Sequence, residues 1–218
     1  MIPELAAKTV LFQGCSPQEV EQLYRCLQMT DRDYTRGTPV LLSGSPVTDI
    51  GIVLSGSVRI ESGDVWGGVS VLGMVEPGGV FAEAYACLPG EPLLVDVIAN
   101  TDCRILFLNV PRLLQPCGQA CGCHNQVIRN LVMASARKNL HLSQRIFHTA
   151  PKTIRGRLLS YLSQQAALQG GSRVTIPFDR QQLADYLSVD RSALSKELGK
   201  MQREGLLEFR KNVFILKV

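Results

Sequence analysis

The chain has 218 residues, of which 45% are hydrophobic and 19% are charged, a balance typical of globular proteins and not of disordered ones. Its N-terminus lacks a basic segment followed by an apolar run, and no apolar run approaches the ~20 residues of a membrane helix, so we expect a cytoplasmic protein without a signal peptide or a membrane partner. Its positive charge is concentrated in residues 150–218, which carry 12 Lys and Arg against 6 Asp and Glu, and this favours a phosphate-bearing partner.

The first predicted element is a short helix over residues 16–28. Ser16 is a suitable N-cap, Pro17 occupies the first helical position and Glu19 completes a capping box. Over residues 34–110, short apolar runs alternate with glycines, which predicts the many short strands of an all-β barrel or jelly roll. The runs are Pro39–Leu42, Ile50–Leu54, Val58–Ile60, Val69–Val75, Leu93–Ala99 and Cys103–Leu108.

Residues 124–148 contain neither Pro nor Gly and predict one helix of about 25 residues, roughly 37 Å long. Its apolar stripe needs a partner surface, which could be a second copy of the helix, the chain's own β domain, or both. Pro151 cannot continue the helix, so residues 149–153 are expected to form a hinge. The predicted stripe consists of Ile128, Leu131, Val132, Ser135, Leu142 and Ile146.

Residues 179–198 predict two short helices joined by a tight turn, the helix-turn-helix pattern whose second helix lies in the DNA major groove. Asp179 can cap the first helix, with Gln182 as its capping-box partner, and Asp190 can cap the second. Apolar side chains would lock the two helices together, and polar side chains on the first turns of the second would reach base edges. The apolar set is Leu183, Ala184, Leu187, Val189, Leu194 and Leu198; the base-edge set is Arg191, Ser192, Ser195 and Lys196.

The basic residues of this region differ in their expected roles. Arg191 is the strongest candidate for reading guanine, because its fork can bond O6 and N7 together, and Lys196 could do the same or contact only phosphate. Arg180, at the start of the first motif helix, is placed for a backbone phosphate. Farther on, two apolar segments flank Arg210 and Lys211, which predicts a β-hairpin wing with a basic tip.

Taken together, these elements resemble the cyclic-AMP receptor/FNR (CRP/FNR) family of bacterial transcription regulators. The similarity is greatest in Leu54-Ser-Gly-Ser-Val, in Glu76-Pro-Gly-Gly-Val-Phe-Ala-Glu and over residues 180–207. The resemblance implies an α+β fold with three parts. They are a cyclic-nucleotide-binding-like β-roll (jelly roll) with an N-terminal helix in residues 1–116, a linker turn and dimerisation helix in residues 117–148, and a winged helix-turn-helix in residues 149–218.

The resemblance also implies a homodimer on a DNA operator with two-fold symmetry, whose half-sites lie about one helical turn apart. Arg191, Ser192 and Lys196 fall where the family reads bases, and Arg180 falls where it touches phosphate. Ser188 departs from the glycine that the family often has in the turn.

The expected effector differs from that of the cyclic-AMP binders in the family. Those proteins carry a Gly-Glu pair that binds ribose, followed by an Arg-Ser or Arg-Thr pair whose Arg neutralises the cyclic phosphate. Here Ala82 and Glu83 stand at the first pair, and Leu93 and Leu94 stand at the second. Two leucines facing a phosphate remove a charge-assisted partner, so we do not expect cyclic AMP to bind. Glu83, Leu93 and Leu94 would then face an unidentified effector, unless Glu83 is a structural carboxylate.

Seven cysteines in a chain without a secretion signal are expected to be reduced thiols, not a disulfide framework. Cys117, Cys121, Cys123 and His124 form a cluster that could ligate zinc or an iron–sulfur cluster or form a disulfide, or could pack as small apolar residues. Its spacing matches neither a standard zinc motif nor the FNR cluster. Cys26, Cys87 and Cys103 lie in apolar runs and are expected in the core.

These patterns predict a sequence-specific DNA-binding transcription regulator, not an enzyme, that responds to an unidentified effector. The sequence shows no phosphate loop, nucleophile elbow or paired carboxylates at a meaningful spacing. An alternative is a ligand-binding regulatory module that acts through protein contacts, as cyclic-nucleotide domains do on kinases and channels. RNA polymerase is a further predicted partner, through a loop over residues 164–173.

Overall fold

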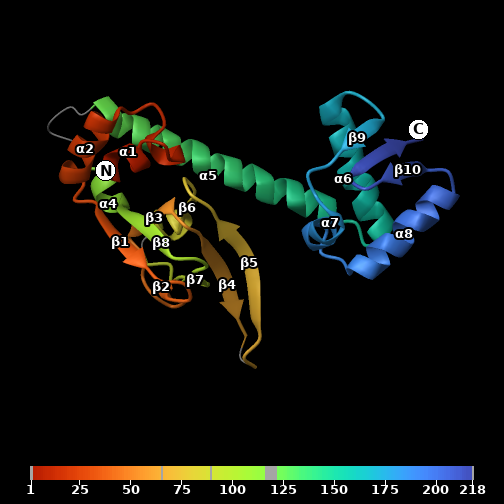
Figure 1. Cartoon of the computed structure of the whole chain (residues 1–218), viewed down its shortest axis with the longest axis horizontal. Helices are drawn as coiled ribbons and strands as arrows, with labels where there is room; N and C mark the ends of the chain where they lie inside the picture. The colour runs from red at the N-terminus through yellow and green to blue at the C-terminus, as the bar shows by residue number, and fades with distance from the viewer. Residues whose placement is uncertain (1, 65, 89, 116–121, 218) are drawn as a thin grey trace. The chain divides into compact units, whose positions relative to one another are not determined.

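The computed structural model describes residues 2–64, 66–88, 90–115 and 122–217. The chain forms two compact units, Met1–Arg137 and Lys138–Val218. Figure 1 shows a β-rich unit and a unit of helices around a small sheet, and the long helix α5 contributes residues to both. The mixed α and β architecture confirms the predicted fold class.

The first unit begins with three short helical elements, α1 (Ile2–Ala6), the 3₁₀ helix η1 (Val10–Phe12) and α2 (Pro17–Cys26). The capping box predicted for α2 is confirmed: the Ser16 N–H donates to Glu19 Oε2 at 2.8 Å, and the Glu19 N–H donates to Ser16 Oγ at 3.3 Å. The buried face of these helices, including Leu11, Phe12 and Val20, belongs to the main core of the unit.

Two antiparallel four-stranded sheets form the β-roll that the glycine-punctuated runs predicted. One has the order β1-β8-β3-β6 and the other β2-β7-β4-β5. The short α3 (Glu83–Ala86) follows β6, and α4 (Val110–Leu113) follows β8. The strands are β1 (Thr30–Tyr34), β2 (Pro39–Leu41), β3 (Asp49–Ser55), β4 (Val58–Gly63), β5 (Val69–Val75), β6 (Val80–Phe81), β7 (Asp96–Ala99) and β8 (Cys103–Asn109).

The long predicted helix is confirmed as α5 (Gly122–Thr149), 28 residues in length. Its first turns pack on the β-roll unit, since Cys123, Val127 and Leu131 lie in that core. Other members of the predicted stripe are exposed, among them Val132, Leu142 and Ile146, at 63%, 63% and 65%. The chain's own β domain is therefore one partner of α5, but it covers only part of the apolar surface.

The second unit surrounds the predicted motif with a separate core. Leu158, Leu183, Leu194 and Phe214 are fully buried in it. A three-stranded sheet of order β10-β11-β9 closes one side, and its antiparallel β10–β11 hairpin is the predicted wing. The elements are α6 (Ile154–Gln169), β9 (Arg173–Thr175), α7 (Arg180–Tyr186), α8 (Arg191–Arg203), β10 (Leu207–Arg210) and β11 (Val213–Leu216).

The loop predicted over residues 164–173 is largely helical, because α6 continues to Gln169. Gly170 then ends the helix with φ +70°, the left-handed conformation that glycine adopts readily after a C-terminus. Only residues 170–172 connect α6 to β9. Within the described residues, no helix is long and apolar enough to cross a membrane.

Candidate functional site

The helix-turn-helix forms as the capping residues predicted. Asp179 accepts from the Gln182 N–H at 2.8 Å, and Gln182 Oε1 accepts from the Asp179 N–H at 2.8 Å. Asp190 caps α8 by accepting from the Ala193 N–H at 2.8 Å. The Ser192 hydroxyl and this N–H both donate to Asp190 and hold the pKa of its carboxyl below the usual value. The cap therefore stays ionised, and its charge suits the positive end of α8.

All four predicted base-edge residues are exposed on the first two turns of α8. The two serines also bond locally, since Ser192 Oγ donates to Asp190 Oδ1 at 2.5 Å and Ser195 Oγ donates to the Arg191 carbonyl at 2.9 Å. Arg191 and Lys196 extend into solvent from the same end of the helix. This end of α8 therefore presents two cations and two hydroxyls, the groups that base-edge recognition uses.

The Arg180 side chain, predicted to contact a phosphate, is partly buried against the wing. Its guanidinium lies 5.0 Å from the Phe209 ring centroid and 5.7 Å from that of Phe214, both on the wing. It also donates from Nη2 to the Lys211 carbonyl at 3.2 Å, and burial lowers its pKa. Arg180 thus fastens α7 to the wing by cation–π contacts and a hydrogen bond, in addition to any role at phosphate.

The tip of the wing carries the predicted basic pair. Arg210 and Lys211 are both exposed, and Lys211 has φ +55° in the tight turn. The Asn212 side chain donates to the Ile176 carbonyl at 3.0 Å, and the Asn212 carbonyl accepts from the Ile176 N–H at the same distance. These bonds fix the tip against the segment before α7, so the two basic side chains project from a defined turn.

Sequence reasoning missed an ion-pair network that joins α8 to the start of α6. Arg155, in the first turn of α6, donates to Glu197 at 2.7 Å and to Glu204 at 2.8 Å. Both carboxylates raise the pKa of Arg155, and Arg155 lowers that of Glu204. Arg155 lies 42 and 49 positions from the two glutamates, so only the fold reveals that the ion pairs orient α8 relative to α6.

In the β-roll, the residues expected to face an effector have different environments. Ala82 adopts φ +61°, which explains why glycine suits this position, and Glu83 directly after it is 7% exposed at the start of α3. Leu93 is 1% exposed and packs in the main core, whereas Leu94 is 71% exposed. The structure does not bring the two leucines together on one surface, so only Leu93 points into the β-roll.

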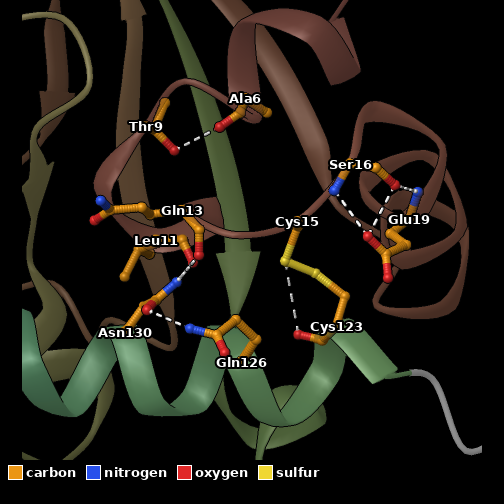
Figure 2. Close-up of a disulfide and its surroundings, with 10 residues drawn as sticks. All are labelled: Ala6, Thr9, Leu11, Gln13, Cys15, Ser16, Glu19, Cys123, Gln126 and Asn130. Atoms are coloured by element: carbon orange, nitrogen blue, oxygen red, sulfur yellow. Dashed lines mark hydrogen bonds between the residues drawn. A yellow bond between two sulfur atoms is a disulfide. The ribbon is translucent and has the colours of Figure 1, made fainter.

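The cysteines depart from the expectation of reduced thiols. Cys15, before α2, forms a disulfide with Cys123, in the first turn of α5, and their Cα atoms are 5.8 Å apart (Figure 2). The pairing joins residues 108 positions apart, so no sequence spacing revealed it. Cys26 and Cys87 are exposed instead of buried in the core, while Cys103 is buried as predicted.

The predicted metal cluster is described only in part, because Cys117 and Cys121 lie outside the described residues. While Cys123 is in a disulfide, it cannot serve as a thiolate ligand. His124 is 5% exposed; its Nε2 donates to the Leu113 carbonyl at 2.5 Å and its Nδ1 has no partner among the described residues. In the described part of the chain, no group of three or more His, Cys, Asp or Glu is arranged to hold a metal.

A side-chain clamp lies beside the disulfide and supports it. Asn130 of α5 donates from Nδ2 to the carbonyls of Leu11 and Gln13, both at 2.8 Å (Figure 2). Gln126 donates to Asn130 Oδ1 at 2.9 Å and so fixes the amide orientation. Two different kinds of bond therefore hold the N-terminal segment on the start of α5.

Comparisons with known proteins agree with both units. Residues 31–119 match the model of the cyclic nucleotide-binding domain, and residues 156–218 match the model of the Crp-like helix-turn-helix domain. The CRP-like cAMP-activated global transcriptional regulator of Mycobacterium tuberculosis (strain CDC 1551 / Oshkosh) is 26% identical over 203 residues, which are 93% of this chain and 89% of that protein.

Solved structures share the fold at lower identity. The catabolite activator protein of Thermus thermophilus is 23% identical with a TM-score of 0.52, covering 96% of this chain and 94% of that one. CprK in complex with OCPA is 16% identical with a TM-score of 0.62, covering 90% and 91%. The c-di-GMP responsive regulator CLP of Xanthomonas campestris is 20% identical with a TM-score of 0.56, covering 93% and 100%.

Proposed function

Because the chain belongs to the cyclic-AMP receptor/FNR family of transcription regulators, whose members are not enzymes, we propose that α8 reads a specific DNA operator. One observation carries this proposal: Arg191, Ser195 and Lys196 are exposed together at the capped start of α8. Arg210 and Lys211 on the wing tip supply phosphate contacts beside it. The protein would work in the cytoplasm, where the DNA is.

The test is DNA affinity measured by fluorescence anisotropy on a duplex selected from a random pool. Arg191→Ala should weaken specific binding by about 1–3 kcal/mol and relax the preference at one base pair. Lys211→Ala should weaken binding to all sequences and reduce the salt slope by about 1. Unchanged affinity and preference in Arg191→Ala would remove that residue from base readout. Weak wild-type binding with little salt dependence would favour a module that acts through protein contacts.

We further propose that the protein is a homodimer joined through α5. Met133, Leu140 and Phe147 recur at seven-residue intervals on this helix and are 42%, 62% and 71% exposed. Such a repeat is typical of a helix that packs against a second copy of itself. Two copies would present two recognition helices to an operator with two-fold symmetry.

RNA polymerase remains a proposed partner for the exposed turn at residues 170–172.

The effector we propose is not cyclic AMP, although the mycobacterial relative is named for that nucleotide. Leu93 and Leu94 stand where cyclic-AMP binders are expected to carry the pair whose Arg neutralises the phosphate, and burial of Leu93 in the core adds no polar partner there. Isothermal titration with cyclic AMP should give no heat of binding at micromolar protein. Tight binding would contradict this proposal and leave the DNA-reading proposal intact.

A redox signal is a second candidate for the effector, and the Cys15–Cys123 disulfide favours it. Disulfides in the reducing compartment where bacterial DNA lies are usually transient or regulatory. A dithiol reductant would attack one sulfur, form a mixed disulfide and leave with its own ring disulfide, so that two electrons and two protons reduce the pair. DNA affinity should then change between oxidised and dithiothreitol-treated wild type and stay constant in Cys15→Ser. Stoichiometric iron or zinc in anaerobically purified protein would instead favour the metal cluster.

A further inference from the structure

Two arginines from outside the helix-turn-helix bind the C-terminal end of α7. Arg145, near the end of α5, donates from Nε and Nη2 to the carbonyl oxygens of Tyr186 and Asp185, at 3.2 and 3.1 Å. Arg157, in the first turn of α6, donates from Nη1 to the next two carbonyl oxygens along the chain, both at 2.9 Å. We call this arrangement of two guanidinium groups on four consecutive carbonyls the carbonyl clasp.

The clasp adds donors to carbonyls at and just beyond the end of α7, of which, among the described residues, only that of Asp185 also accepts from a nearby backbone group, the Ser188 N–H at 3.2 Å. The last carbonyls of a helix lack intrahelical partners and carry the negative end of its dipole, so cations are favoured there. Arg157 reaches the carbonyls of Leu187 and Ser188, which form the turn before α8. Ser188 has φ +53°, a strained conformation for a residue with a side chain, and the bond to its carbonyl stabilises it.

Arg157, together with Ser160, also fixes the segment that joins α5 to α6. Arg157 Nε donates to the Pro151 carbonyl at 2.9 Å, and Ser160 Oγ donates to the Phe147 carbonyl at 3.3 Å. The turn that the sequence suggested as a hinge is therefore tied down within the second unit. That unit also includes α5 from Lys138 onward.

Tyr186 receives a second contact from α5. Its hydroxyl lies 2.8 Å from His148 Nδ1, and its ring centroid lies 5.4 Å from that of Tyr161 and 5.0 Å from that of Phe178. The end of α5 thus holds both the main chain and the side chain of the last residue of α7. A rotation of this part of α5 would carry the turn, and α8 after it, along with it.

We propose that Arg145 and Arg157 are positioning residues for DNA readout, acting through the turn and not by touching DNA. The clasp joins the end of α5 and the recognition helix into one body, so a movement of α5 reaches α8 directly. This inference rests on the proposed function. The competing role for two arginines in a DNA-binding unit is direct phosphate contact, and the two roles predict different responses to charge and salt.

The test replaces each arginine by lysine in the full chain. Arg157→Lys and Arg145→Lys keep the positive charge but lose the planar fork. Each arginine donates from Nε and from a terminal Nη, and the single nitrogen of an ammonium group cannot occupy both positions. If the turn then holds the conformation that binds DNA in about a tenth of the molecules, operator affinity falls about tenfold. Affinity for random-sequence DNA and the slope of log affinity against log salt should stay as in the wild type, because no phosphate contact is lost.

Lys152→Ala is the matched control, since it removes one positive charge from an exposed side chain between α5 and α6. It should leave the ratio of operator to random-sequence affinity unchanged. Circular dichroism melts verify that each variant is folded at the assay temperature. Should Arg157→Lys unfold there, Arg145→Lys decides, because it leaves every Arg157 bond in place.

Wild-type operator affinity in both lysine variants would overturn the clasp, and so would a loss of affinity that is equal for operator and random-sequence DNA. If the wild type itself shows no preference for any duplex and no steep salt dependence, the proposed function fails first. If the wild type binds its operator specifically and both lysine variants bind it equally well, the positioning role of the clasp is refuted and the proposed function stands.

Discussion

At the scale of single residues, Ser188 holds a backbone conformation that suits glycine. Its φ of +53° lies in the left-handed region, where a Cβ atom costs roughly 1–2 kcal/mol. Glycine would remove that cost but would gain conformational freedom in the unfolded chain, which offsets part of the benefit. Ser188→Gly should therefore raise the free energy of unfolding by up to about 1 kcal/mol, as measured by urea denaturation.

The control for this prediction is Ser188→Ala, which removes the hydroxyl and keeps the Cβ atom. Alanine should leave stability within about 0.5 kcal/mol of the wild type, as is usual for an exposed site. Equal stabilisation by alanine and glycine would show that the hydroxyl, and not the backbone conformation, accounts for the effect.

His148 predicts a dependence of stability on pH. It is 3% exposed, and burial lowers its pKa from 6.5. The groups that face it are the Tyr186 hydroxyl, the Tyr161 ring and Gln164, whose hydrogen bond opposes the shift only in part. Below pH 6.5 the unfolded chain binds a proton that the folded chain does not, so this contribution to stability is full above that pH and is lost as pH falls toward the folded pKa.

Urea denaturation of the wild type between pH 7.5 and 5.5 measures this loss. His148→Gln has no titrating group at this position, so its stability should change less over the same interval. An identical pH dependence in both proteins would assign the effect to other groups. Equal circular dichroism spectra at pH 7.5 are required before the two curves are compared.

At the scale of elements, α5 needs a partner for the exposed heptad of Met133, Leu140 and Phe147. Leu140→Glu places a charge in the middle of this repeat, where two copies would bring two carboxylates together in an apolar seam. Sedimentation should show a monomer in place of a dimer, with operator affinity lowered at least tenfold by the loss of the second recognition helix.

Lys138→Glu tests whether an added negative charge alone causes this change, since Lys138 is exposed on the same helix. It should remain dimeric at micromolar concentration. A dimer in Leu140→Glu would move the interface away from this face of α5.

The elements also show why some of the structure could be predicted and some could not. The helices α2, α7 and α8 were predicted with their caps, because capping residues act within a few positions of one another. The loop predicted over residues 164–173 was wrong because its polar residues proved helical, and Gly170 was the better guide to the helix end. The cap at Asp190 correctly placed Arg191, Ser192, Ser195 and Lys196 on the first two turns of α8, and their contact with base edges stays a prediction.

The contacts that could not be predicted join distant parts of the sequence. The Cys15–Cys123 disulfide, the Arg155 ion pairs and the carbonyl clasp each depend on which surfaces the fold brings together. Arg145 and Arg157 look like ordinary surface cations when only composition and spacing are considered. Their carbonyl partners belong to the main chain, so no pattern of side chains could reveal them.

At the scale of the whole molecule, the DNA-reading unit has a core of its own. Leu158, Leu194 and Phe214 are buried within it, and the clasp residues lie inside its limits of Lys138–Val218. A fragment of residues 138–218 should therefore fold alone, as a cooperative thermal transition would show. It lacks most of α5, including Met133, so it should be a monomer and bind DNA far more weakly than the full chain.

Salt dependence then separates the contribution of one reading unit from that of two. Each phosphate neutralised contributes about 0.9 to the slope of log affinity against log salt. A dimeric full chain places two equal units on its operator, so its slope should be about twice that of the monomeric fragment, whatever the number of phosphates per unit. Equal slopes would mean that the full chain uses one unit at a time and would contradict the two-fold arrangement. Arg191→Ala in the fragment should lower affinity for a half-site without changing its slope, because a base contact neutralises no phosphate.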